Sequence, residues 1–137
     1  MASYETTIRE GHLDTFGHVN NAVYLELLEE ARWEMITQNG YGLEEVKRTG
    51  IGPIVVEINI KFRKEIKLRE RITIETTCLE HHRKIGKIRQ RILNSQGQEC
   101  AVALVSSALF DTKKRVLVLP GEAWLKAVGL LGLGKLS

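Results

Sequence analysis

The 137-residue chain is poor in cysteine and has no long uninterrupted apolar run. Its two cysteines, Cys78 and Cys100, lie far apart in strand-like apolar segments, so we expect buried free thiols and no disulfide. The four histidines show no metal-ligand spacing with cysteine, and the sequence predicts neither a metal site nor a cofactor. The chain has no segment suited to a membrane span, and its first residues lack a signal peptide's apolar core. We therefore expect a cytoplasmic protein with no membrane partner.

The net charge is small, because the 20 Lys and Arg residues are nearly balanced by 17 Asp and Glu residues, which leaves a net charge of +3. This total predicts no nucleic-acid partner. The distribution is uneven, however, since eleven of the 20 basic residues lie between Lys61 and Arg91, against four acidic ones. A solvated strand face explains most of this cluster by default. Its functional interpretation is a site for a small polyanion, such as the phosphates of a nucleotide carrier.

The remaining composition, 43% hydrophobic and 27% charged, is typical of one globular domain, which we place at residues 1–128. Period-two alternation predicts a first strand near Tyr4–Ile8, and apolar spacings of three and four predict a helix from Asn20 or Asn21 to about Gln38. A helical turn is expected in 42–50, followed by a break at Gly52-Pro53. The Gly/Leu-rich tail, residues 129–137, is either frayed or held against a partner subunit.

Four further strands are expected after this break. Alternation predicts three of them around residues 58–63, 72–78 and 88–92, and the apolar run 100–110 predicts a buried central strand. Short polar links at 67–71, 81–84 and 94–97 predict hairpins, hence an antiparallel meander. Pro120 is expected to be the first residue of a final helix. The pattern indicates an α+β fold, a five-stranded antiparallel sheet curled around one long central helix. Its edges are unprotected, which favours pairing with a second copy.

The most informative segment is residues 14–24, DTFGHVNNAVY. A carboxylate, Asp14, and an imidazole, His18, stand four residues apart in a loop containing Gly17. Asn20 and Asn21 then open the long helix, whose positive end stabilises developing negative charge. Capping by itself explains at least one of the two asparagines, and a turn-capping role is the ordinary use of an aspartate such as Asp14. Together, these residues favour acyl-transfer chemistry.

This segment, with the strand–loop–helix–meander order around it, resembles the hotdog-fold thioesterases, the superfamily of 4-hydroxybenzoyl-CoA thioesterase. The resemblance implies a homodimeric or homotetrameric acyl-CoA thioesterase, with Asp14 as the catalytic carboxylate, acting as nucleophile or as the base that activates water. Amides near Asn20, Asn21 and Ala22 would form the oxyanion hole. In this interpretation His18 and Asn21 complete the catalytic set.

The same resemblance implies a substrate-binding set. Gly17 and Asn20 belong to it in the loop, and Arg83 and Lys84 would bind the CoA phosphates from a hairpin. His18 acts as a base, orients the substrate, or ties the loop to the helix.

Two departures separate the chain from the plant acyl-ACP thioesterases of the superfamily. Phe16 stands where their loop has an asparagine, and Lys61 stands where they place a glutamate. Two alternatives nevertheless stay open, hydrolysis of an acyl-ACP and non-catalytic binding of an acyl-CoA.

Overall fold

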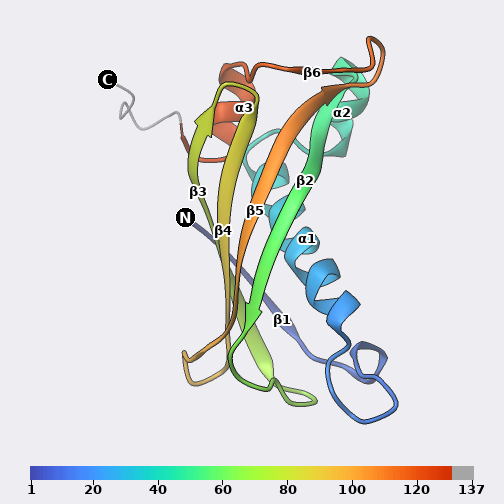
Figure 1. The fold of residues 1–137 in the computed structure, drawn as a ribbon, viewed down its shortest axis with the longest axis vertical. Coiled ribbons are helices and arrows are strands. Elements are labelled where there is room, and N and C mark those ends of the chain that lie inside the picture. Colours follow the sequence, from blue (N-terminus) through green and yellow to red (C-terminus); the bar gives the residue numbers. More distant parts are fainter. Residues whose placement is uncertain (131–137) are drawn as a thin grey trace.

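A computed structural model describes residues 1–130 of the chain. The first half begins with strand β1 (Ala2–Thr7) and a 3-10 turn (Glu10–His12), and then forms helices α1 (Asn21–Gln38) and α2 (Leu43–Thr49). The second half is built from strands β2 (Ile51–Phe62), β3 (Arg71–His82), β4 (Ile85–Leu93), β5 (Glu99–Asp111) and β6 (Val116–Val118), and from helix α3 (Glu122–Ala127). The long strands curl around α1, as Figure 1 shows. The predicted α+β hotdog architecture is therefore confirmed, with a small sixth strand added.

The sheet is antiparallel throughout and has the order β1-β3-β4-β5-β2, with β6 paired to β5. This order confirms the predicted central position of β5. The predicted hairpin at 67–71 is wrong, because β2 pairs with β5 and not with β3. The connection from β2 to β3, residues 63–70, crosses two strands. Its length is compatible with a hairpin, so the link by itself did not reveal which partner β2 selects.

Two local expectations also differ from the structure. Gly52 and Pro53 lie inside β2, where Pro53 pairs with Leu109. A proline is tolerated there because β2 is an edge strand, and one side of its backbone needs no ladder partner. Pro120 does not begin α3, since Gly121 is the N-cap and Glu122 the first helical residue. The predicted tail falls mostly outside the described residues.

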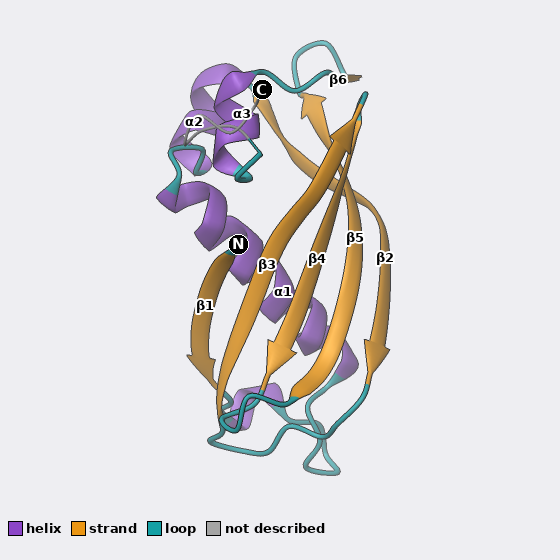
Figure 2. Cartoon of the chain, turned by 90° about the vertical axis from the view of Figure 1, so that its left-hand side faces the viewer, coloured by secondary structure: helices purple, strands orange, loops and turns teal. Residues whose placement is uncertain are grey.

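Helix α1 supplies the centre of the core. Its residues Tyr24, Leu27, Leu28, Ala31 and Met35 are buried at the spacings of three and four residues that predicted the helix, whereas Val23 is only partly covered. Figure 2 shows α1 running behind the strands, with α2 and α3 at one end of the sheet. A second apolar cluster forms at that end, where Tyr41 packs edge-on against Trp124 with ring centroids 5.3 Å apart. No helix among the described residues is long and apolar enough to cross a bilayer.

Candidate active site

The loop before α1 is closed by its own backbone. The Asp14 amide donates to the His18 carbonyl (2.7 Å), the Gly17 amide donates to the Asp14 carbonyl (3.1 Å), and Leu13 bridges Val19. Gly17 has φ +80°, a conformation that residues with a Cβ rarely adopt. The glycine of the motif is therefore required by the turn itself. This tight turn places Asp14 and His18 at the entrance to α1.

The Asp14 carboxylate stabilises the same turn. Its Oδ1 atom accepts hydrogen bonds from the amides of Phe16 (2.9 Å) and His18 (3.0 Å). Oδ2 has no hydrogen bond within residues 1–130, and the side chain is only half-buried. Asp14 is thus a turn-capping aspartate whose second oxygen is held in a fixed direction. The structural and chemical interpretations of this residue are compatible, because they use different oxygens.

The amides at the start of α1 have different partners. Asn20 is the N-cap, and its side-chain Oδ1 accepts from the Ala22 amide (2.8 Å). The Asn20 amide itself donates to the His12 carbonyl (3.0 Å). Of the three amides in the predicted oxyanion hole, only that of Asn21 therefore has no acceptor in the described part of the chain. Asn21 is the first helical residue, where the helix dipole reinforces a free N–H as an anion site.

His18 lies beside a shallow cleft of about 320 Å³ between the start of α1 and the end of β2. Asn21 and Tyr24 line one side, while Phe62 and Glu65 line the other. The His18 Nε2 atom is 3.8 Å from a Glu65 carboxylate oxygen, and both side chains are largely exposed. Asp14 is not among the residues lining this cleft. Asp14, Gly17, His18, Asn20 and Asn21 all lie in or directly beside the loop before α1, and His18 and Asn21 are the two of them that line the cleft.

Sequence reasoning did not identify Phe62 and Glu65 as site residues. The Phe62 ring packs edge-on against Tyr24 with centroids 4.9 Å apart, and burial raises the pKa of the Tyr24 hydroxyl. Lys61 occupies the position at which the plant acyl-ACP thioesterases place a glutamate. Glu65, four residues later in the chain, nevertheless places a carboxylate near His18. Little in the sequence singled out Glu65. It is an acidic residue among basic neighbours, and a glutamate in a loop is ordinary.

Arg83 and Lys84 lie at the other end of the sheet. They form the turn between β3 and β4, and they border a hollow with His82, Lys87 and Leu119. The segment that leads into the Asp14 loop lies beside the start of β3, because the Ile8 amide donates to the carbonyl of Glu70, the residue before β3. The twelve residues of β3 then span about 40 Å to the basic turn. Figure 1 shows this separation. One chain therefore does not bring the basic pair to Asp14.

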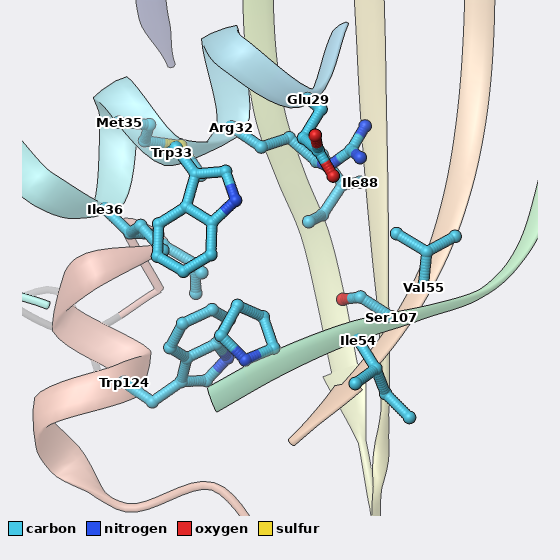
Figure 3. Close-up of a pocket in the computed structure, with 12 residues that line it drawn as sticks. Glu29, Arg32, Trp33, Met35, Ile36, Ile54, Val55, Ile88, Ser107 and Trp124 are labelled. Atoms are coloured by element: carbon cyan, nitrogen blue, oxygen red, sulfur yellow. The ribbon is translucent and has the colours of Figure 1, made fainter. Parts of the chain in front are cut away.

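A separate cavity of about 290 Å³ lies between α1, α3 and the start of β2. Figure 3 shows Trp33 and Trp124 on one side of it and Val55 and Ser107 on the other, with Glu29 and Arg32 at its edge. Such an apolar cavity with few polar groups is typical of ligand pockets. We did not predict it, because its lining comes from residues spread over α1, β2, β4, β5 and α3. No group of three or more potential metal-ligating side chains occurs within residues 1–130.

The chain matches known proteins over most of its length. Residues 8–128 match the model of the thioesterase-like superfamily. The long-chain acyl-CoA thioesterase FadM of Escherichia coli is 38% identical over 117 residues, which cover 84% of this chain and 88% of FadM. The crystal structure of YbaW, a probable thioesterase from Escherichia coli, superimposes with a TM-score of 0.82 at 32% identity and covers 92% of this chain and 98% of YbaW. The acyl-acyl carrier protein thioesterase ATL2 of Arabidopsis thaliana is 35% identical over 72 residues, 53% of this chain and 38% of ATL2.

Proposed function

This chain belongs to the thioesterase-like superfamily and is a thioester hydrolase, and we propose that it hydrolyses acyl-CoA with Asp14 as its catalytic carboxylate. The observation that carries the proposal is that one loop, directly before α1, holds both the Asp14 carboxylate, fixed through Oδ1, and an Asn21 amide that has no acceptor within residues 1–130. Oδ2 of Asp14 attacks the thioester carbonyl or removes a proton from the attacking water. His18 and Asn21 border the cleft that holds the reacting group.

The Asn21 amide is the proposed oxyanion donor. Negative charge develops on the carbonyl oxygen when the tetrahedral intermediate forms, and a preorganised N–H stabilises it without reorganisation. A carboxylate is a weak base and nucleophile, so much of the stabilisation must come from this amide and from the dipole of α1. The neighbouring amides of Asn20 and Ala22 serve the loop and the cap, which limits the oxyanion hole in this chain to one helix amide.

In a dimer, the basic turn of one copy can lie close to Asp14 of the other copy, although the two are far apart within one chain. The outer edge of β2 has no strand partner among the described residues of its own chain, and it carries exposed Ile54, Val55 and Val56. If β2 pairs antiparallel with β2 of a second copy, the Phe62 end of one strand faces the Ile54 end of the other. The Arg83–Lys84 turn lies at the Ile54 end of the sheet, because Gly86 and Val55 both pair with Ser107. The basic turn of one copy therefore approaches the loop of the other and binds the CoA phosphates there.

The test is thiol release from aliphatic and aromatic acyl-CoAs by the wild type and by Asp14→Asn. We expect Asp14→Asn to lower kcat by roughly a hundredfold or more, because the amide is neither a base nor a nucleophile. Thr15→Ala, a change at an exposed neighbour in the same loop, serves as the control and should retain activity. Equal turnover by wild type and Asp14→Asn would remove Asp14 from its role. Acyl-CoA binding without turnover by the wild type would instead indicate a non-catalytic binder.

A second candidate substrate is an acyl-ACP, which the likeness to ATL2 over half of the chain favours. Both carriers present the thioester on a pantetheine arm, and they differ in the nucleotide that only CoA has. Removal of the nucleotide half distinguishes them. If acyl-CoA is the substrate, the wild type should have a lower kcat/KM for the acyl-pantetheine than for the acyl-CoA. An Arg83→Ala/Lys84→Ala variant should likewise have a lower kcat/KM for acyl-CoA than the wild type has. Unchanged kcat/KM in both cases would favour the acyl-ACP.

A further inference from the structure

One stripe of α1 connects the proposed reaction site with the cavity of Figure 3. Asn21, Leu25, Glu29 and Arg32 follow at spacings of four, four and three residues, which places them on the same face of the helix. Asn21 borders the His18 cleft, whereas Glu29 and Arg32 line the cavity. Leu25 between them is 40% exposed. A long acyl chain whose thioester lies at the loop would run along this face of α1, past Leu25, to reach the cavity.

Arg32 is held in the cavity wall by a buried hydrogen-bond network. Its Nη1 atom donates to Oε1 of Gln90 (2.9 Å). Gln90 is fully buried and donates in turn to the Leu28 carbonyl (2.9 Å) and to the Thr76 hydroxyl (3.0 Å). Because Gln90 joins β4 to both β3 and α1, the guanidinium at its end has a fixed position. Arg32 is thus a rigid donor and not a solvated surface cation.

The guanidinium retains unused hydrogen-bonding capacity. An arginine carries five N–H groups, and the network with Gln90 occupies one of them. No carboxylate oxygen lies within 4.0 Å of the Arg32 nitrogens in residues 1–130. Burial lowers the pKa of Arg32, while the charge of Glu29 opposes that change. A charged group that is partly desolvated and has no ion-pair partner gains from a ligand that supplies an acceptor.

The neighbouring Glu29 narrows the chemistry of that ligand. Glu29 offers acceptor oxygens at the edge of the same cavity, close to the Arg32 side chain in Figure 3. A hydroxyl accepts from a guanidinium and donates to a carboxylate, so it satisfies both residues at once. A carboxylate on the acyl tail is attracted by Arg32 but repelled by Glu29, and a purely aliphatic tail covers Arg32 without supplying an acceptor. The two side chains together therefore favour a hydroxyl.

We propose that this cavity binds the tail of a hydroxylated acyl chain and that Arg32 is the specificity-determining residue for the hydroxyl. The proposal rests on the proposed function, because it assumes that the thioester lies at the Asp14 loop. Glu29 follows Asn21 by eight positions in the helix, or roughly 12 Å along α1. An extended chain advances roughly 1.2 Å per bond. The hydroxyl accordingly lies about ten carbons from the thioester, in the middle of a long acyl chain.

The test compares kcat/KM for 10-hydroxyhexadecanoyl-CoA and hexadecanoyl-CoA. We expect the wild type to prefer the hydroxylated substrate by about tenfold, as a hydrogen bond to a charged group provides. Arg32→Leu should reduce this ratio to about one while hexadecanoyl-CoA is still hydrolysed. Glu29→Gln changes an exposed side chain that does not support the fold, and it should lower the ratio in part. Glu26→Gln, an exposed change on the same helix outside the cavity, is the matched control.

A wild-type ratio of one or less would overturn the proposal, as would a ratio that Arg32→Leu and Glu29→Gln leave unchanged. Failure of the proposed function has a different signature, because then neither CoA ester is hydrolysed. In that case calorimetric titration with 10-hydroxyhexadecanoate and hexadecanoate decides the question. Tighter binding of the hydroxylated acid that is lost in Arg32→Leu would support the cavity assignment, and equal binding of both acids would refute it.

Discussion

Single residues of the loop combine structural roles with the chemical roles that we propose for them. Asp14 uses one carboxylate oxygen to hold the turn, and Asn20 uses its side chain to cap α1. These arrangements leave the amide of Asn21 without an acceptor within residues 1–130. Because each polar group has a separate task, a change at one position disturbs the geometry of the others. The loop is therefore sensitive to substitutions that do not remove any chemical group from the site.

Gly17 gives a residue-scale prediction. Its φ of +80° disfavours any residue with a Cβ, although a Cβ there would meet no atom within 4 Å. We expect Gly17→Ala to destabilise the loop by about 1–2 kcal/mol and to lower kcat by roughly tenfold or more through misplacement of Asp14. Thermal unfolding and thiol release measure the two effects. Gly11→Ala is the control, since Gly11 has open space and no positive φ. Equal activity of both variants would contradict the argument.

Among the elements, the long strands are joined by an ionic network on the partly exposed side of the sheet. Arg91 of β4 contacts Glu75 of β3 and Glu99 of β5, each at 2.8 Å, and Arg63 contacts Glu99 at 3.0 Å. These pairs lie across neighbouring strands, where opposite charges stabilise the register. The basic cluster seen in the sequence is thus partly neutralised by cross-strand carboxylates, which supports its interpretation as a strand face.

This network gives a pH prediction. The Arg91 hydrogen bond holds the pKa of Glu99 below its ordinary value of 4.5. The resulting stability is present above that ordinary value and is lost as the pH falls through the lower folded-state pKa. Urea unfolding at about pH 6 and about pH 3 should therefore show a larger loss of stability for the wild type than for Arg91→Met. Lys47→Met removes an exposed lysine of α2 that forms no ion pair within residues 1–130 and does not affect the pKa of Glu99, so this control should behave like the wild type. Identical pH profiles for all three proteins would refute the assignment.

At the scale of the whole molecule, the β2 edge of the sheet has no strand partner within residues 1–130. A bulge interrupts its pairing with β5 between Val55 and Glu57, and Val56 at this point is 50% exposed. An edge strand with exposed apolar residues is prone to pair with another chain. Since the cavity wall includes Ile54 and Val55, pairing at this edge also completes the surroundings of the proposed acyl site.

We therefore expect the wild type to be a dimer or a larger assembly and Val56→Lys to dissociate it. Two-fold symmetry places both substituted lysines in one interface, where the introduced charges are desolvated and repel each other. Light scattering after size exclusion measures the assembly state, and thiol release should decline with it. Val116→Lys changes an equally exposed valine on β6 and should retain the assembly. A monomeric wild type with full activity would contradict the two-copy site.

The sequence by itself determined α1, the α+β class and the loop from Asp14 to Asn21, because these depend on local periodicity, capping and turn chemistry. The helix bounds follow from the N-cap Asn20 and the stop at Asn39-Gly40, and the turn follows from Gly17. The oxyanion assignment needed one refinement, since the partners of the Asn20 and Ala22 amides become visible only when the loop is folded.

Only the tertiary structure decided which strand β2 pairs with, where Arg83 and Lys84 lie, and that Glu65 approaches His18. It alone also revealed the cavity around Arg32 and its support by Gln90. The physical reason is the same in each case. Strand pairing and cavity walls join residues that are distant in the chain, and an edge strand has no local pattern that specifies its neighbour. Local patterns positioned the groups that we propose to be reactive, and long-range packing determined the space proposed for the substrate.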